Sequence, residues 1–220
     1  SPKPGARFAA VATEHVVPDV YVYKRGAQWE VGLNPGAAPK LRVNDHYVNL
    51  LRRCARDEGT ALKSQLQEAR WLLKSLEQRD QTVLKVARVI VERQQAFLER
   101  GAEAMKPLVL REVAAEIGMH ESTVSRVTTR KYMHTPRGTL EFKYFFSSHV
   151  ATRDGGEASS TAIQAMIKKL IDEESPQKPL SDSAISDVLK RRGILVARRT
   201  VAKYREAMRI PSSNERVRSA

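Results

Sequence analysis

LREVAAEIGMHESTVSRV, residues 110–127, has the pattern of a helix-turn-helix, in which two short helices are joined by a tight turn. Val113 and Ile117 lie on the inner face of the first helix, and the small side chain of Ala114 lets the second helix cross closely. Gly118 supplies the left-handed backbone conformation that such a turn needs. The shared core of the two helices would be completed by Met119, Val124 and Val127.

The second of these helices turns a short polar and cationic face to solvent. Such a face fits the major groove of duplex DNA, where side chains reach base edges and phosphates. Arg126 is the better base reader, because its planar fork can pair with O6 and N7 of guanine. Ser122 and Thr123 suit phosphate or backbone contacts, and an ordinary helical hairpin is the alternative structure. The exposed residues of this face are Glu121, Ser122, Thr123, Ser125, Arg126 and Arg130.

A second cationic helix is predicted near the end of the chain, over residues 197–208. Ser181 caps the helix before it, Gly193 ends that helix, and the turn that follows is longer than in the common motif. The pattern is typical of a phosphate-binding helix, and insertion into a groove is a hypothesis. Its inward residues would be Ile194, Leu195, Val196, Val201, Tyr204 and Met208, and its outward ones Arg198, Arg199, Thr200, Lys203 and Arg205.

A long apolar stripe precedes the first motif, in a segment from Ala61 to about Arg100 without Gly or Pro. Eleven positions follow a 4-3-4-3 spacing and nine of them are apolar, which predicts one helix of about 60 Å. A seam for a partner helix explains the spacing equally well, although Leu72, Val86 and Val89 widen the stripe and favour packing within the chain. The positions are Leu62, Leu66, Ala69, Leu73, Leu76, Asp80, Val83, Ala87, Ile90, Gln94 and Phe97.

The charge of the chain indicates a polyanionic partner. Lys and Arg number 38 against 25 Asp and Glu, a net charge of +13 with a pI near 10.1. Residues 176–220 hold 11 basic and 4 acidic side chains, a net of +7, so about half of the excess lies there. No apolar run approaches the ~20 residues that span a bilayer. The single cysteine, Cys54, fits a reducing cytoplasm, so a nucleic acid is favoured over a membrane.

Signals for catalysis, a metal or a cofactor are missing from the sequence. None of the five histidines stands at zinc-ligand spacing from another, and Gly155-Gly156 lacks the Lys-Ser/Thr of a phosphate-binding loop. We therefore expect no enzyme activity, no metal and no cofactor. Two alternatives to DNA binding stay open: an interaction protein whose long helix docks a partner, and an RNA binder. The strand-borne aromatics and glycines usual in RNA-binding modules are not evident.

The remaining segments predict a mainly α fold. Val20–Tyr23 and Trp29–Leu33 flank a short turn and predict a small β-hairpin. A second helical stretch, which contains the helix-turn-helix, is expected to run from Leu108 to Tyr132. Beyond them we expect a separate, small C-terminal domain of three helices, over residues 160–174, 182–192 and 197–208. Tyr144-Phe-Phe146 could form a stacking platform for bases, but packing in the core is favoured.

ARRTVAKYRE, residues 197–206, resembles the RpoN box, the signature of the bacterial sigma-54 (RpoN) family of RNA polymerase sigma factors. The resemblance spans residues 18–213 and rests on a ten-residue box plus several blocks in order, which makes it highly specific. The further blocks that resemble the family are Gln67–Leu72, Gln94–Phe97, Met119–Thr123, Ser125–Thr129, Ser147–His149 and Gly156–Ser160.

The resemblance implies a cytoplasmic, nucleoid-associated protein that directs core RNA polymerase to promoters. The box domain would read the GG of a minus-24 element, and the helix-turn-helix would lie near the GC of a minus-12 element. A partner activator ATPase of the AAA+ class would control melting, and Arg79 would belong to the region that keeps the polymerase closed until it acts. Arg198 or Arg199 is expected to read guanine, whereas Lys203 and Arg205 are expected to contact phosphates.

The resemblance also divides the chain into expected parts. The hairpin and residues 42–56 look like the end of the family's core-binding domain, so we expect a C-terminal portion with weakened or lost affinity for core polymerase. The expected parts are the end of the core-binding region (1–60), an extra-long helix (61–106), the helix-turn-helix domain (107–150), a flexible linker (151–159), the RpoN-box DNA-binding domain (160–213) and a tail (214–220).

Overall fold

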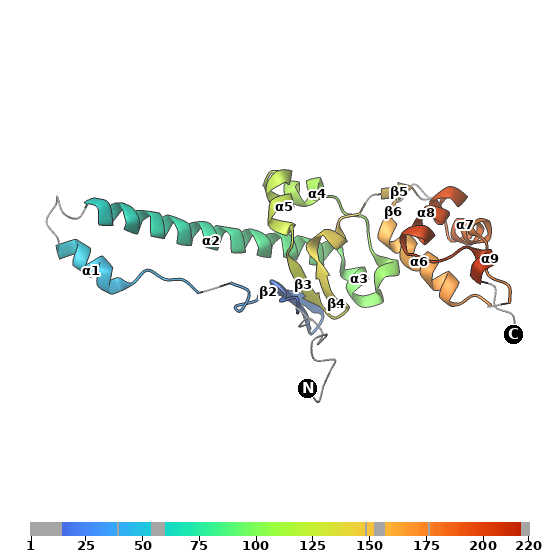
Figure 1. Ribbon diagram of the computed structural model, residues 1–220, viewed down its shortest axis with the longest axis horizontal. Coiled ribbons are helices and arrows are strands. Elements are labelled where there is room, and N and C mark those ends of the chain that lie inside the picture. Colours follow the sequence, from blue (N-terminus) through green and yellow to red (C-terminus); the bar gives the residue numbers. More distant parts are fainter. Residues whose placement is uncertain are drawn as a thin grey trace, which may run out of the picture.

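The computed structural model describes residues 15–38, 40–53, 60–147, 149–151, 157–175 and 177–216. One long helix, a small sheet and several short helices follow one another along an elongated molecule (Figure 1). The elements are β1 (Val20–Arg25), β2 (Gln28–Leu33), α1 (Asp45–Arg53), α2 (Thr60–Arg93), α3 (Gln95–Arg100), η2 (Ala102–Ala104), α4 (Leu110–Glu116), α5 (Glu121–Thr128), β3 (Tyr132–Thr135), β4 (Gly138–Glu141), η3 (Phe142–Phe145), β5 (His149–Ala151), β6 (Glu157–Ser159), α6 (Ser160–Asp172), α7 (Asp182–Arg191), α8 (Arg198–Ala207) and α9 (Ser213–Arg216).

The long helix α2 has 34 residues and is about 51 Å long, and it ends where the predicted helix was expected to continue. The helix is interrupted at Gln94, a polar residue in the apolar stripe whose side chain is buried. Its Nε2 donates to the Lys106 carbonyl oxygen at 2.7 Å, and its Oε1 accepts from the Lys106 backbone N–H at 3.0 Å. Both ends of the buried amide are thus satisfied. The prediction of one helix to Arg100 is wrong, because this polar residue holds the returning chain beside a break between α2 and α3.

The apolar stripe of α2 is used unevenly. Val83, Val86, Ala87 and Ile90 are buried in the main core, which they share with the sheet and the α4–α5 pair. The positions from Leu62 to Leu76 include no buried side chain within the part of the chain that the structure describes. In Figure 1 this first half of α2 extends away from the sheet and the helix-turn-helix, and α1 lies beside its beginning. Packing within the chain therefore accounts for the second half of the stripe and leaves the first half open to a partner.

The predicted hairpin is confirmed, and it forms half of a larger sheet. β1 and β2 pair antiparallel from Val20↔Leu33 to Arg25↔Gln28, and the strand order is β2-β1-β3-β4. β3 lies parallel to β1, with Val20 opposite Met133, and both residues are buried. The hairpin at the start of the chain is thereby joined to the segment that follows the helix-turn-helix.

The prediction of helix through Tyr132 is wrong. α5 ends at Thr128, and Arg130 takes a left-handed φ of 54° that turns the chain into β3. The Arg130 backbone N–H donates to Glu141 Oε1 of β4 at 3.1 Å, which anchors the turn to the sheet. The alternation of Tyr132 and His134 with buried Met133 is a strand signal, but it is short and directly follows a stronger helical pattern.

The C-terminal residues form a second core. α6, α7 and α8 lie near their predicted positions, and α9 adds a short helix where a tail was expected. Arg216 of α9 donates through Nε and Nη2 to both carboxylate oxygens of Glu174, at 2.7 and 3.1 Å. The helices share a buried cluster made of Ile163, Ile167, Ile185, Leu189, Ile194, Val196 and Val201.

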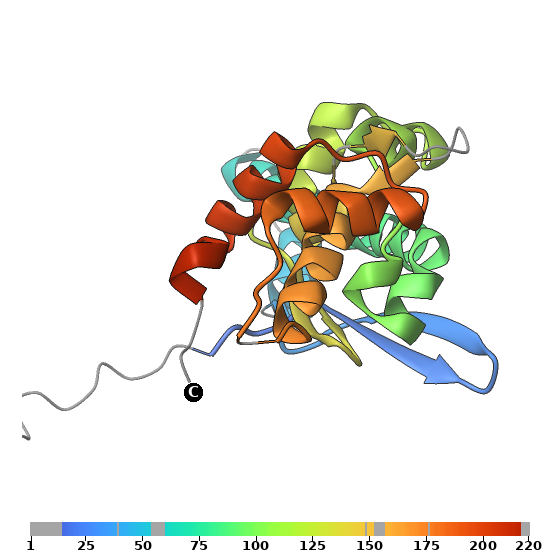
Figure 2. The same cartoon turned by 90° about the vertical axis from the view of Figure 1, so that its right-hand side faces the viewer.

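The expected linker contains secondary structure. β5 and β6 pair antiparallel, from His149↔Ser159 to Ala151↔Glu157, and residues 152–156 between them lie outside the described residues. α6 follows β6 directly and packs against η2, so the C-terminal helices are docked to the rest of the chain. In the end-on view of Figure 2 these helices lie in front of the helix-turn-helix and the sheet.

Candidate nucleic-acid interface

The first helix-turn-helix consists of α4 and α5. Gly118 takes a φ of 67° at the turn, and the Met119 backbone N–H donates to the Ala114 carbonyl oxygen at 2.9 Å. Val113 and Val124 are completely buried between the two helices and α2. His120 caps α5, because its Nδ1 accepts from the Ser122 backbone N–H at 3.2 Å. The turn and core predicted from the sequence are thus present.

The candidate DNA contacts of this module are only partly brought together. Thr123 and Arg126 are exposed three residues apart on α5 and therefore share one face. Ser122 is exposed next to them, but its hydroxyl lies 2.8 Å from His120 Nδ1 and supports the cap. Ser125 is half-buried, and Arg130 stands beyond the end of the helix. Arg126 and Thr123 are the best placed of the five for a groove.

The second helix-turn-helix consists of α7 and α8. Ser181 caps α7 by accepting from the Ala184 backbone N–H at 3.2 Å, and Gly193 has a φ of 85° at its end. Ser186 donates from Oγ to the Val196 carbonyl oxygen at 2.7 Å, which fixes the long turn to α7. Leu195 in this turn is 46% exposed, so the prediction that it packs inward is wrong.

The first turn of α8 concentrates positive charge. Arg198 and Arg199 are exposed there, and Lys203 is exposed one turn further on, four residues from Arg199. The N-cap residue is Ala197, and no side chain among the described residues caps this helix. Two cations beside the positive end of a helix dipole are unfavourable unless an anion joins them. Uncapped N–H groups and two guanidinium groups make this end of α8 suited to a phosphate.

Arg205 corrects one expectation. Its side chain is 7% exposed, and its Nε and Nη2 donate to Asp182 Oδ1 and Oδ2 at 2.9 and 3.2 Å. Nη1 donates to the Ile210 carbonyl oxygen at 2.7 Å. Hydrogen bonding to Asp182 raises the pKa of Arg205 against the opposing effect of burial. This arginine holds α8 against α7 and is not available to a phosphate. Thr200 of the same helix is half-buried.

Glu174 and Arg216 form a second buried ion pair in this unit, with side chains 7% and 9% exposed. Burial by itself would raise the pKa of Glu174. Hydrogen bonds from Arg216 and from the Leu180 backbone N–H, together with the charge of Arg216, outweigh burial and leave this pKa below its ordinary value. The pair fastens α9 to the connection between α6 and α7.

Arg79 is exposed on α2, just beyond the midpoint of this helix, and is far from both cationic helix faces in sequence. It lines a pocket of about 330 Å³ with Asp80, beside the Lys131 Nζ–Asp19 Oδ1 ion pair of 2.6 Å. The pocket lies between α2 and the chain that follows β2. The structure thus explains the interruption of the apolar stripe at Asp80, which faces this mixed cavity and not the core.

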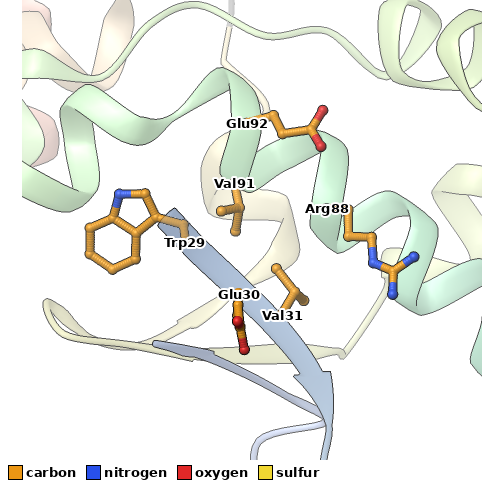
Figure 3. A pocket seen from close by; sticks show the side chains of 6 residues that line it. All are labelled: Trp29, Glu30, Val31, Arg88, Val91 and Glu92. Carbon is orange, nitrogen blue, oxygen red and sulfur yellow. The ribbon is translucent and has the colours of Figure 1, made fainter. Parts of the chain in front are cut away.

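A second pocket of about 330 Å³ lies where β2 meets α2 (Figure 3). Trp29 and Val31 of β2 lie on the side of the strand that faces Val91 of α2, whereas Glu30 points to the other side of the strand. Lys24 Nζ lies 5.4 Å from the centre of the Trp29 ring, in a cation–π contact. The described lining of this pocket mixes apolar, acidic and basic groups and contains no nucleophile beside a base. The charged residues that α2 contributes to this lining are Arg88 and Glu92.

The described residues contain no group of three or more His, Cys, Asp or Glu that could hold a metal ion. No helix among them is both long and apolar enough to cross a bilayer.

Three supporting residues were missed in the sequence. Asp182, Ser186 and Gln94 each stabilise a turn or a helix end through a partner far along the chain. Asp182 stands in the first turn of α7, where an acid also favours the helix dipole, so its position alone does not reveal that it pairs with Arg205.

Both helix-turn-helix modules lie within a region that matches a known family model. A family model for the sigma-54 DNA-binding domain matches residues 59–218, and one for the sigma-54 factor core-binding domain matches residues 1–47. The RNA polymerase sigma-54 factor of Azotobacter vinelandii is 58% identical over 219 residues, 99% of this chain and 44% of the relative. That of Escherichia coli K12 is 55% identical, over 98% of this chain and 45% of the relative. The chain therefore spans less than half the length of these relatives.

A crystal structure of Aquifex aeolicus sigmaN bound to promoter DNA is similar in fold. The two chains are 36% identical, with a TM-score of 0.59, and the match covers 94% of this chain and 62% of that one.

Proposed function

Because this chain belongs to the sigma-54 family, we propose that it recognises promoter DNA through its two helix-turn-helix modules and acts without catalysis. α8 reads the GG of a minus-24 element, and α5 lies at the GC of a minus-12 element. The relative from Aquifex aeolicus is bound to promoter DNA in its crystal structure, which supports a DNA ligand for this chain. The finer assignment to two elements is what the resemblance of residues 197–206 to the RpoN box implies.

The first turn of α8 carries this proposal. Arg198 and Arg199 are exposed at a helix end without a side-chain cap among the described residues. A phosphate at the free N–H groups would orient the helix, and one guanidinium would then reach O6 and N7 of guanine. Lys203 lies on the same face and contacts a phosphate of the flanking backbone. Arg205 fixes the angle of α8 from behind through Asp182.

α5 makes the second contact with a less cationic face. Arg126 is its base reader and Thr123 its neighbouring polar contact, both on the exposed side of the helix. His120 and Ser122 shape the end of α5 that enters the groove. One cation on this face predicts a smaller electrostatic share of binding than at α8.

Protein partners complete the proposed function. Residues 1–47 match the core-binding family model, so we assign core RNA polymerase to this end of the chain. An AAA+ activator ATPase would control melting in the complete system. Arg79, exposed on α2 beside the pocket at Asp80, is the residue we assign to the closed state of the polymerase.

Fluorescence anisotropy with duplexes tests the proposal. One duplex carries GG and GC at sigma-54 spacing, and a control duplex alters only the GG, both at one fixed salt concentration. We expect binding to the altered duplex to weaken by about 10- to 100-fold, as for the loss of a bidentate guanine contact. Equal affinity for both duplexes would reduce the interaction to non-specific electrostatics and would reject promoter recognition by α8.

A further inference from the structure

α6 belongs to two cores at once. Ala162 on this helix is 3% exposed and is part of the main core with α2, the sheet and the first helix-turn-helix. Ile163 and Ile167 are completely buried in the C-terminal core with α7 and α8. A helix that is buried on both sides cannot rotate independently of either unit without opening one core.

Polar contacts hold the start of the same helix. Ser159 caps α6, accepting from the Thr161 backbone N–H at 3.2 Å, and its Oγ lies 2.8 Å from Ser147 Oγ. Both serines are buried. The Ser147 backbone N–H in turn donates to the Leu108 carbonyl oxygen at 3.1 Å, two residues before α4 begins. The beginning of α6 is thereby connected to the beginning of the first helix-turn-helix.

A third contact lies near the far end of α6. Lys169 Nζ is 3.0 Å from Glu103 Oε1 of η2. Ser159, Ala162 and Lys169 stand at intervals of three and seven residues, so they share one face of the helix. The contacts span ten residues, about 15 Å along the helix axis. Contacts separated by this length resist both bending and rotation of the C-terminal unit.

We propose that this face of α6, and not the connection between β5 and β6, sets the distance and angle between α5 and α8. It thereby selects the spacing of the two DNA elements. The inference rests on the proposed function and makes Ser147, Ala162 and Lys169 positioning residues. Adding one base pair moves two sites on B-DNA apart by about 3.4 Å and turns one by about 35° around the axis. A fixed joint loses one element after such a change, whereas a flexible tether adapts to it.

Figure 1 is consistent with this role, since α5 and α8 lie on the same, upper side of the molecule with β5 and β6 between them. One candidate DNA face therefore lies on each side of the joint formed by α6 and η2. Their relative position follows from contacts of folded elements.

The test measures binding of the 220-residue chain to duplexes whose GG and GC are one or two base pairs closer together or farther apart. We expect affinity to fall at least about tenfold for a change of one base pair, approaching that of a duplex with GG alone. The spacing profile is the affinity plotted against the number of base pairs between GG and GC. Ala162→Arg, which forces a large charged side chain into the joint, should flatten this profile. Its affinity for the GG-only duplex should stay unchanged, which also shows that α8 remains folded.

Charge variants repeat the test without disturbing the core. Lys169→Glu places two acids together at the joint and should partly flatten the profile, and Glu103→Lys added to it should restore the wild-type profile. Lys168→Glu is the matched control, because Lys168 is an exposed neighbour with the same charge change. It should leave the profile as it is. A Gly-Ser-Gly-Ser insertion after Gly155 should also leave it unchanged.

Two results would overturn the inference. One is a flat spacing profile in the unaltered chain. The other is a profile that the insertion flattens and that Ala162→Arg and Lys169→Glu leave alone, which would assign spacing to the β5–β6 connection. Both differ from failure of the proposed function, in which the GG alteration itself would have no effect at any spacing.

Discussion

α5 and α8 occupy equivalent places in two helix-turn-helix modules, yet their N-terminal ends are built in opposite ways. α5 is capped by His120 and has Glu121 in its first turn, so its dipole is balanced within the chain. α8 starts from Ala197 and has Arg198 and Arg199 in that turn. The difference suits the two roles that we propose. The N-terminal end of α5 is balanced within the chain, whereas that of α8 is left without a side-chain cap, within the described part of the chain, for the proposed phosphate.

The two helices also differ in how their inner faces pack against the rest of the protein. α5 packs on α2 through an apolar core that includes Val124. α8 relies in addition on the buried arginine Arg205, which pairs with Asp182. One cation of α8 therefore stabilises the fold, and substitutions can distinguish it from the exposed cations that we propose contact DNA.

The largest effect is expected from Arg205→Ala, which leaves Asp182 with an unpaired, mostly buried charge. The free energy of unfolding should fall by about 3–5 kcal/mol. Urea unfolding followed by circular dichroism measures this change. The double variant Arg205→Met with Asp182→Leu should recover most of the loss, because no charge is then stranded. A loss below about 1 kcal/mol in the single variant would contradict a structural role for Arg205 and return it to the DNA face.

Arg199→Ala should affect binding and not folding. Removing a bidentate guanine contact costs about 1–3 kcal/mol at one base position. The expected loss is therefore seen on the GG duplex in anisotropy titrations and disappears when the GG is altered. Arg198→Ala is the companion variant, and comparison of the two identifies which arginine reads the base. An equal loss on both duplexes would make the arginine a backbone contact.

Exchanging the end chemistry of the two helices tests the comparison in both directions. Ala197→Asp should raise the free energy of unfolding by about 1 kcal/mol, since it adds a cap and a favourable charge. The same change should weaken DNA binding, because the carboxylate occupies the place of a phosphate. His120→Ala should cost about 1 kcal/mol of stability at α5. If Ala197→Asp left DNA affinity unchanged, the end of α8 would not be a phosphate site.

Acid should weaken the C-terminal unit through Glu174. Because its pKa is lowered in the folded protein, its contribution is complete above the unfolded pKa of about 4.3 and is lost as the pH falls through the lower folded value. Stability measured by urea unfolding from pH 6 to pH 3 should therefore fall. Glu174→Gln should lower stability at pH 6 and reduce the slope below pH 4.3. An unchanged slope in this variant would show that other carboxylates cause the acid sensitivity.

The smallest effect is expected from Lys203→Ala. A phosphate contact is insensitive to sequence, so affinity should fall slightly and equally for GG-containing and altered duplexes. The slope of log affinity against log salt should decrease by about one. Arg126→Ala on α5 provides the contrast, because its loss should depend on the GC and not on the GG.

Local patterns predicted the parts of this fold that depend on neighbouring residues. The turn at Gly118, the hairpin at Val20–Leu33 and the positions of α6, α7 and α8 follow from spacing, caps and glycines. The same patterns fail where contacts with distant segments determine the secondary structure. β3 forms because β1 offers it a parallel partner 113 residues earlier, at Val20↔Met133. The break of α2 depends on Lys106, which bonds to Gln94.

The candidate site divides in the same way. The exposed cations on α8 could be predicted from the sequence, because they lie on the helix face opposite Val201, which must face the core. Arg205 has the same chemistry and stands two residues after Lys203, and only the carboxylate of Asp182 separates their roles. An acid 23 residues away in sequence cannot be paired with one particular arginine from a pattern alone.

The most direct measurement combines protein variants with altered duplexes in one series of anisotropy titrations. The unaltered chain, Arg198→Ala with Arg199→Ala, and Arg126→Ala are each titrated against duplexes altered at the GG, at the GC, or at neither. We expect the α8 variant to lose discrimination at the GG while keeping it at the GC, and the α5 variant to do the reverse. Uniform losses for both variants on all three duplexes would contradict sequence recognition by two modules and leave only attraction between a basic chain and DNA.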